Sequence, residues 1–192
     1  MAAAPRNAFR SHVEDSLREL GADPALLRRR RLPLFADARS LHCVGLGTDG
    51  RDKFLAPPAA RAWLAMREAA AAEGVELLLI SAFRSFEFQL ALIRGKLAKG
   101  RAIAEILTVN APPGCSEHHS GRAVDIGARD TAALEEEFEN TPQFAWLMRH
   151  ANRHGFHLSY PRGNRYGYLY EPWHWCHRVR PEQDRAIHGT DC

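Results

Sequence analysis

The pattern of apolar and polar positions divides the chain into short helices and short strands. Residues 8–20 predict an amphipathic helix, because their apolar side chains recur at spacings of three and four. These apolar positions are Phe9, Val13, Leu17 and Leu20. Residues 31–54 show no such period and carry turn-forming glycines, so we expect that segment to be irregular.

A longer helix is predicted over residues 57–73. This stretch opens with two prolines and ends before Gly74, and both features are typical of helix boundaries. Residues 75–81 are apolar except for one glutamate and one serine, which predicts a short buried strand. Helical spacing returns over residues 85–97, and a shorter helix is expected over residues 102–107.

The second half of the chain is predicted to mix strands and helices. Residues 122–127 alternate as a strand does, which places Asp125 on one face and Val124 on the other. Helices are expected over residues 131–138 and 143–154, and strands over residues 156–160 and 165–175. This order of elements predicts an α+β fold in a single domain, with a small antiparallel sheet packed by helices.

Composition agrees with one domain of ordinary size. The chain has 192 residues, of which 45% are hydrophobic and 26% are charged, and it contains no apolar run long enough for a membrane span. The net charge of +3 is mildly basic. The densest basic run, residues 28–31, is interpreted as a solvated helix end, and no nucleic-acid partner is expected because aromatic residues do not interleave it.

The N-terminus and the cysteines suggest a reducing compartment. The first twenty residues lack the continuous apolar stretch of a secretory signal, so we expect a cytoplasmic protein, with export by another route left open. No two cysteines have the short spacing of a zinc knuckle or a redox pair, and free thiols are expected. The cysteines are Cys43, Cys115, Cys176 and Cys192.

Two segments almost fifty residues apart, 116–125 and 171–174, carry the candidate chemistry. Their candidate metal ligands are His118, Asp125 and His174. Two imidazoles and one carboxylate suit a catalytic zinc ion, which keeps a fourth position for water. Glu171 would be free to take a proton from that water. Oligomeric state stays open.

Two local features qualify this assignment. His119 is the nearest rival to His118 as a ligand, and we expect it to have a structural role instead. Glu171 and His174 would face opposite sides of a regular strand, while Pro172 disfavours a helix, so we expect a bulge or twist that aims both at the metal. The remaining histidines are interpreted as surface or core residues: His12, His42, His150, His154, His157, His177 and His188.

The ordered motifs resemble a known family. The pattern is Ser116-x-His118-x-x-Gly121-x-Ala123-x-Asp125 followed by Glu171-Pro172-Trp173-His174. It resembles the VanY-type D-alanyl-D-alanine carboxypeptidases, zinc metallopeptidases related to the VanX dipeptidases and, in fold, to the hedgehog signalling domain. Residues 81–89 are similar to a Ser-x-x-Arg-Ser segment of that family, and residues 146–147 and 155–161 add a fourth match.

The resemblance implies roles for individual residues. It implies one zinc ion on His118, Asp125 and His174, with Glu171 as general base and then general acid. Arg84 would stabilise the developing oxyanion or hold the substrate, and a guanidinium suits this role because it is permanently charged. Gln89 and Ser116 would bind the substrate's terminal carboxylate or backbone. The implied substrate is a peptide from peptidoglycan or its precursors.

Several alternatives remain open at this stage. The carboxypeptidase-like core is expected over residues 57–192, with residues 1–56 as an N-terminal extension that packs with it as one domain. A peptidoglycan endopeptidase of the same fold would use the same metal site. A zinc-stabilised binding or signalling module is a third possibility, which the presence of both Glu171 and Arg84 disfavours.

Overall fold

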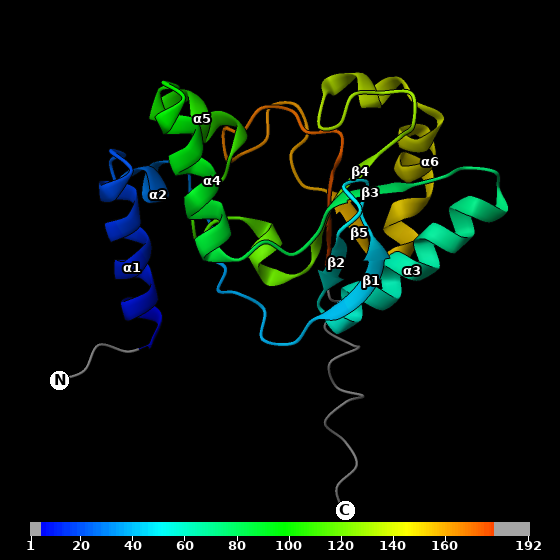
Figure 1. The fold of residues 1–192 in the computed structure, drawn as a ribbon, viewed down its shortest axis with the longest axis horizontal. Helices are drawn as coiled ribbons and strands as arrows, with labels where there is room; N and C mark the ends of the chain where they lie inside the picture. The colour runs from blue at the N-terminus through cyan, green and yellow to red at the C-terminus, as the bar shows by residue number, and fades with distance from the viewer. Residues whose placement is uncertain (1–4, 179–192) are drawn as a thin grey trace, which may run out of the picture.

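A computed structural model describes residues 5–178 of the chain (Figure 1). A four-stranded antiparallel sheet with strand order β3-β4-β6-β5 stands at its centre. The strands are β3 (Leu78–Ser81), β4 (Ala123–Gly127), β5 (Phe156–Leu158) and β6 (His174–His177). The predicted α+β fold with a small antiparallel sheet is therefore confirmed.

A separate hairpin precedes this sheet. Strands β1 (His42–Leu46) and β2 (Asp52–Leu55) pair antiparallel, so the expectation of an irregular segment over residues 31–54 is wrong for its second half. Most side chains of β1 are exposed, with only Val44 buried. A strand with one buried position has no clear alternation, which is why the apolar pattern did not indicate it.

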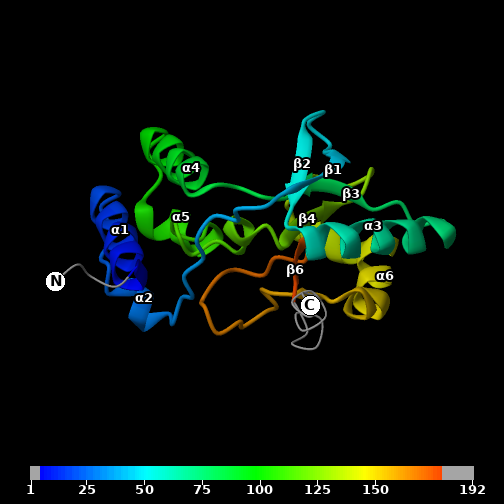
Figure 2. The same ribbon diagram turned by 90° about the horizontal axis from the view of Figure 1, so that it is seen from below.

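Helices flank the sheet at both ends of the molecule (Figure 2). They are α1 (Pro5–Glu19), α2 (Leu26–Arg29), α3 (Pro57–Ala72), α4 (Phe86–Ala98), α5 (Ile103–Val109) and α6 (Pro142–His150). Three short 3₁₀ helices are η1 (Glu117–Ser120), η2 (Glu136–Asn140) and η3 (Ala151–His154). Among residues 5–178, no helix has both the length and the apolar character needed to cross a membrane.

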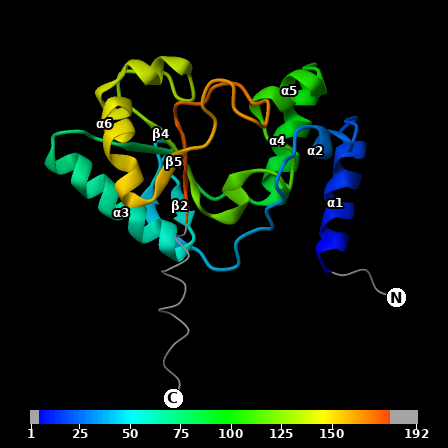
Figure 3. The same ribbon diagram turned by 180° about the vertical axis from the view of Figure 1, so that it is seen from behind.

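Two hydrophobic clusters hold these layers together. The first lies between the sheet and helices α3 and α6, and includes Trp63, Ile126 and Trp146. The second joins α1 to α4 and α5, which lie at the opposite end of the molecule from α3 (Figure 3). Leu17 and Ile93 are fully buried in this second cluster. The N-terminal helix thus shares a packed core with α4 and α5.

The basic run at residues 28–31 is a largely solvated helix end, as expected, and within it only Arg30 is half-buried. Arg30 donates one hydrogen bond to the carbonyl of Leu107 at 2.7 Å and another to the carbonyl of Tyr166. Its guanidinium also lies over the ring of Tyr168, 4.3 Å from the centroid. Arg30 therefore ties the N-terminal region to the loop that leads to β6.

Two predicted elements of the second half are wrong. Residues 131–138 do not form one helix, because the chain stays irregular to Glu135, Leu134 adopts a positive φ of 62°, and only η2 follows. The strand expected over residues 165–175 begins only at His174. Before it, the side chain of Asn164 accepts hydrogen bonds from two backbone amides of the loop at 3.2 and 3.3 Å, and such local bonds compete with strand pairing.

Gly121 forms the turn that joins η1 to β4, and these two elements carry the two halves of the first motif. It ends η1 with a φ of 66°, a left-handed conformation that glycine adopts at little cost. Its carbonyl accepts a hydrogen bond from Ala56 at 2.8 Å. A Cβ at this position would lie 2.9 Å from the Ala56 nitrogen and 3.1 Å from Leu41, so the backbone packs closely against residue 121.

We expect Gly121→Ala to destabilise the protein more than Gly100→Ala does. Both glycines have positive φ, at 66° and 80°, but no atom lies within 4 Å of the Cβ position at Gly100. The strain of a left-handed alanine costs about 1–2 kcal/mol in each case. The clash at Gly121 should add about 1 kcal/mol or more. Urea unfolding monitored by tryptophan fluorescence measures the difference, and equal losses would contradict the close packing.

Candidate metal centre and catalytic residues

The three predicted ligands come together at the centre of the molecule. His118 lies in η1, Asp125 in β4, and His174 is the first residue of β6. The antiparallel register of β4 and β6 places Asp125 directly opposite His174. All three side chains are buried, and one potential ligand atom from each lies within 4.8 Å of the others. This set is suited to hold one metal ion.

The imidazole of His118 is oriented for coordination. Its Nδ1 lies 2.6 Å from the carbonyl of Ala82, which fixes the proton on that nitrogen. Its buried Nε2 forms no hydrogen bond among the described residues and lies 3.3 Å from a carboxylate oxygen of Asp125. Burial and the nearby Arg84 lower the pKa of His118 to about 4, so the ring stays neutral. An unpaired lone pair in a buried site is what a metal ligand requires.

His174 lies between two carboxylates. Its Nδ1 is 3.0 Å from Asp125 and its Nε2 is 3.0 Å from Glu117, while the ring of Tyr160 stacks on it at 4.6 Å. Burial opposes a charge here, but hydrogen bonds to the two carboxylates raise the pKa of His174 to about 10. The pKa of Asp125 lies well below its usual value despite burial. The two carboxylates therefore favour positive charge at the position of His174, as those of a cation-binding site should.

Glu117 is a functional candidate that the sequence analysis did not single out. Burial alone would raise its pKa, but hydrogen bonds from His174 and Ser159 hold that pKa at about 2. Glu117 is half-buried, and a carboxylate on the far nitrogen of a metal-binding histidine fixes the orientation of the ring. In the sequence, only its position directly before His118 could have indicated that Glu117 belongs to the site. The bond to His174, 57 residues away, was not visible in the sequence.

Glu171 approaches the ligands from a turn. The backbone amide of His174 donates to the carbonyl of Glu171 at 3.1 Å, so the expected departure from a regular strand is present, but as a turn at residues 171–174 and not as a bulge or twist. One carboxylate oxygen of Glu171 lies 4.0 Å from Nδ1 of His174. Burial raises the pKa of Glu171 to about 7. A carboxyl group with this pKa exchanges protons readily at neutral pH.

Arg84 borders the same site. It follows β3, and its guanidinium lies 3.8 Å from Asp125. The side chain is 20% exposed, and its Nε is buried with no hydrogen-bond partner among the described residues. Arg84 is therefore not a surface ion pair, and it retains donors that face the pocket.

A small inner pocket of about 30 Å³ adjoins the ligands. Gln89 and Ser116, the two predicted substrate-binding residues, both line it. Gln89 donates to the carbonyl of Ala111 at 2.8 Å, and its Oε1 has no partner in the described chain. Tyr168, which the sequence analysis did not single out, adds a buried hydroxyl that also lacks a described partner.

The rival ligand His119 has a structural role, as expected. Its Nδ1 lies 2.6 Å from the carbonyl of Arg84, and its Nε2 accepts a hydrogen bond from the amide of Gly114 at 3.0 Å. With both ring nitrogens engaged, His119 fixes the backbone beside the site. Cys115 and Cys176 are buried free thiols outside the ligand set, Cys43 is an exposed free thiol, and Cys192 lies outside the described residues.

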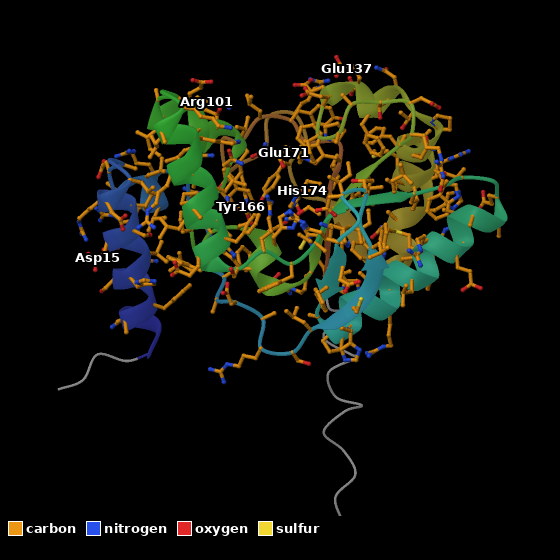
Figure 4. The ribbon with its side chains drawn as sticks, in the orientation of Figure 1. Asp15, Arg101, Glu137, Tyr166, Glu171 and His174 are labelled. Atoms are coloured by element: carbon orange, nitrogen blue, oxygen red, sulfur yellow. The ribbon has the colours of Figure 1, made fainter. Side chains whose placement is uncertain are left out.

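An outer cleft of about 360 Å³ opens from the same site, with Arg84, Asp125 and Glu171 in its lining. Figure 4 shows Glu171 and His174 at the centre of the molecule, between the helical end that carries Arg101 and the segment that carries Glu137. The inner pocket and the outer cleft meet at Arg84 and Glu171. A ligand that enters from the outer cleft therefore passes the candidate base and the candidate oxyanion donor before it reaches the inner pocket.

Comparison with known proteins places the chain beside cell-wall peptidases. The model of the VanY D-alanyl-D-alanine carboxypeptidase family matches residues 52–180. A putative carboxypeptidase, YodJ of Bacillus subtilis (strain 168), is 35% identical over 126 residues, which are 64% of this chain and 45% of that protein. The bifunctional D-Ala-D-Ala dipeptidase and D-Ala-D-Ala carboxypeptidase VanXYC of Enterococcus gallinarum is 29% identical over 148 residues. These residues cover 74% of this chain and 77% of that protein. The chain thus spans less than half the length of YodJ.

Solved structures show the same fold. The LdcB LD-carboxypeptidase superposes with a TM-score of 0.67 at 28% identity, covering 79% of this chain and 73% of its own. A mutant of the vancomycin-resistance D,D-pentapeptidase VanY in complex with Zn(II) gives a TM-score of 0.58 at 27% identity. The match covers 83% of this chain and 88% of the VanY chain. The fold is therefore that of VanY-like peptidases.

We expect Glu117→Gln to weaken zinc binding about tenfold to a hundredfold, because an amide orients His174 less firmly than a carboxylate does. His118→Ala should remove most of the zinc. Competition with a chromophoric chelator measures both affinities. Glu87→Gln, on the exposed face of α4, is the matched control and should bind zinc as wild type does. Wild-type affinity in Glu117→Gln would contradict the orienting role.

Proposed function

Because the chain belongs to the VanY family of D-alanyl-D-alanine carboxypeptidases, we propose that it is a zinc-dependent peptidase that removes the C-terminal D-amino acid from cell-wall peptides. The observation that carries this proposal is the meeting of a buried three-residue ligand set with Glu171 and Arg84 at one pocket. The proposed ligands of a single zinc ion are His118, Asp125 and His174. When bound there, zinc supplies a water of lowered pKa and polarises the scissile carbonyl.

Glu171 is the proposed general base and acid. Its carboxylate would accept the proton of the attacking water and later deliver that proton to the amine that leaves. A pKa of about 7 supports this double role, because the group is close to half protonated at neutral pH. The buried position of Glu171 also keeps bulk water from competing for the proton.

Arg84 is the proposed donor to the oxyanion that develops on the scissile carbonyl. Its guanidinium is permanently charged, lies at the junction of the inner pocket and the outer cleft, and keeps one donor, Nε, without a partner among residues 5–178. Fixed donors of this kind stabilise the transition state more than the ground state. The guanidinium also lies 3.8 Å from the carboxylate of Asp125, and the attraction between these opposite charges holds the side chain near the ligand set.

The inner pocket supports a carboxypeptidase. It is small, and the side chains at its inner end are almost completely buried. Those side chains are Gln89, Ser116, Tyr160 and Tyr168. A peptide that continued beyond the cleaved residue would need space that this pocket does not offer. We propose that it holds one small terminal residue, with its carboxylate bound by the Ser116 and Tyr168 hydroxyl groups and with the free Oε1 of Gln89 accepting a hydrogen bond from a backbone N–H of the peptide.

Two alternatives differ in what they release. A peptidoglycan endopeptidase would release internal fragments from a defined muropeptide, whereas a carboxypeptidase releases free D-alanine. A zinc-stabilised binding module would bind a peptide without hydrolysing it, and such a module would need neither Glu171 nor Arg84. Substrate identity also bears on location, because a cytoplasmic enzyme would act on precursors or on recycled peptides.

We expect Glu171→Ala to keep its zinc and to lose about 10²–10⁴-fold in kcat, the usual contribution of a general base. The assay follows D-alanine release from a pentapeptide stem that ends in D-Ala-D-Ala, together with zinc content by atomic absorption. Glu68→Ala, an exposed position on α3, is the control and should match wild type. Full activity in Glu171→Ala would show that the proposed base is wrong.

A further inference from the structure

The outer cleft has two walls of opposite charge. Lys96, at the end of α4, and Arg101, just before α5, line it from the helical side. Glu135 and Glu136 line it from the segment that leads into η2. Arg101 and the neighbouring Glu137 mark these two sides in Figure 4, with Glu171 between them. The cleft therefore offers cations on one side and anions on the other.

On the basic wall, Lys96 is the cation without an acidic partner. Its Nζ donates to Oδ1 of Asn110 at 2.5 Å, and no carboxylate within residues 5–178 forms an ion pair with it. Arg101, in contrast, pairs with Glu105 at 2.5 Å. Burial, together with Arg101 and Arg84, lowers the pKa of Lys96, so a bound anion at this place would relieve an unfavourable accumulation of positive charge.

On the acidic wall, Glu135 is the anion without a basic partner. Glu136 pairs with Arg162 at 2.9 Å, whereas Glu135 forms no ion pair with any residue that the structure describes. Lys96 and Glu135 do not pair with each other either, although both line the cleft. A group that carries both charges would match the two walls at once, while a singly charged group would leave one wall without a partner.

Apolar side chains lie beside these charges. Leu134 is 40% exposed and Leu169 is 53% exposed, and both line the cleft. Leu134 also holds a φ of 62°, a costly conformation for leucine, which presents it at this surface. The cleft thus combines an apolar lining with opposite charges, which fits an aliphatic side chain that ends in a charged group.

We propose that the outer cleft is a specificity subsite for a zwitterionic side chain, one whose end carries both a carboxylate and an ammonium group. Lys96 binds the carboxylate, Glu135 binds the ammonium, and Leu134 and Leu169 contact the aliphatic stem. The proposal rests on the proposed peptidase function, since it assigns the residue that precedes the D-Ala-D-Ala end of the substrate. The chemical class is a diamino-dicarboxylic acid, in preference to a diamino acid with a single side-chain charge.

The test uses N-acetylated tripeptides X-D-Ala-D-Ala that differ only in X. X is meso-diaminopimelate, the same residue amidated at its distal carboxyl group, or L-lysine. Wild-type protein should cleave the first with kcat/KM about tenfold higher than the other two, because one charged hydrogen bond to Lys96 is lost in each of them. Equal values for the three peptides would overturn the inference and leave the peptidase proposal intact.

Two variants test the basic wall and the acidic wall of the cleft separately. Lys96→Met should reduce the ratio between the diaminopimelate and lysine peptides to near one, mainly through KM. Glu135→Gln should weaken cleavage of both peptides, because both carry the ammonium group. The matched controls are Lys99→Met and Glu137→Gln, two neighbouring residues that do not line the cleft. A ratio unchanged in Lys96→Met would contradict the assignment of that residue.

Peptide-binding measurements test the proposed subsite even if the protein cleaves none of the three peptides. If wild type cleaves none of the peptides, the peptidase proposal is wrong, and calorimetry with zinc-loaded Glu171→Ala protein measures the same three affinities. About tenfold tighter binding of the diaminopimelate peptide, lost in the double variant with Lys96→Met, would support the subsite. Equal dissociation constants, or no binding of any peptide, would overturn it.

Discussion

The pairing of β4 with β6 sets Asp125 opposite His174, and the other groups of the site are arranged around this register. A slip by one residue would turn one of the two side chains to the other face of the sheet, where Val124 and Trp175 pack into the core. Apolar burial on that face therefore holds the metal ligands in place on this one. The turn at residues 171–174 extends the same constraint to Glu171, because it leads directly into β6.

Charge divides the buried acids of the site into two kinds. Asp125 and Glu117 contact His174, and their pKa values lie below the usual range in spite of burial. Glu171 is buried too, but it lies at 4.0 Å from that ring and keeps a pKa of about 7. Carboxylates a few ångströms apart are thus suited to different tasks, two to hold a cation or its ligand and one to exchange a proton.

The sequence indicated the candidate ligand set through the order and spacing of its two motifs, and it indicated α3 and β4 because their apolar patterns are regular. It did not indicate Glu117, Tyr160 or Tyr168 as members of the site, since their partners lie far away along the chain. Glu117 meets His174 across 57 residues, and the ring of Tyr160 stacks on the same imidazole. The exposed hairpin of β1 and β2 and the turn at Glu171 were missed for a related reason, because pairing and local hydrogen bonds determine them more than apolar period does.

We propose that the ligand set, the proton carrier and the small inner pocket act together on the free end of a peptide. The most direct measurement is mass analysis of products from two pentapeptide stems, one with a free C-terminal carboxylate and one whose C-terminal carboxylate is amidated. Zinc-loaded protein should release one D-alanine from the free acid and leave the amidated peptide intact, with no activity on either after chelation. Cleavage of both peptides at the same internal bond, or undiminished activity without metal, would contradict the account.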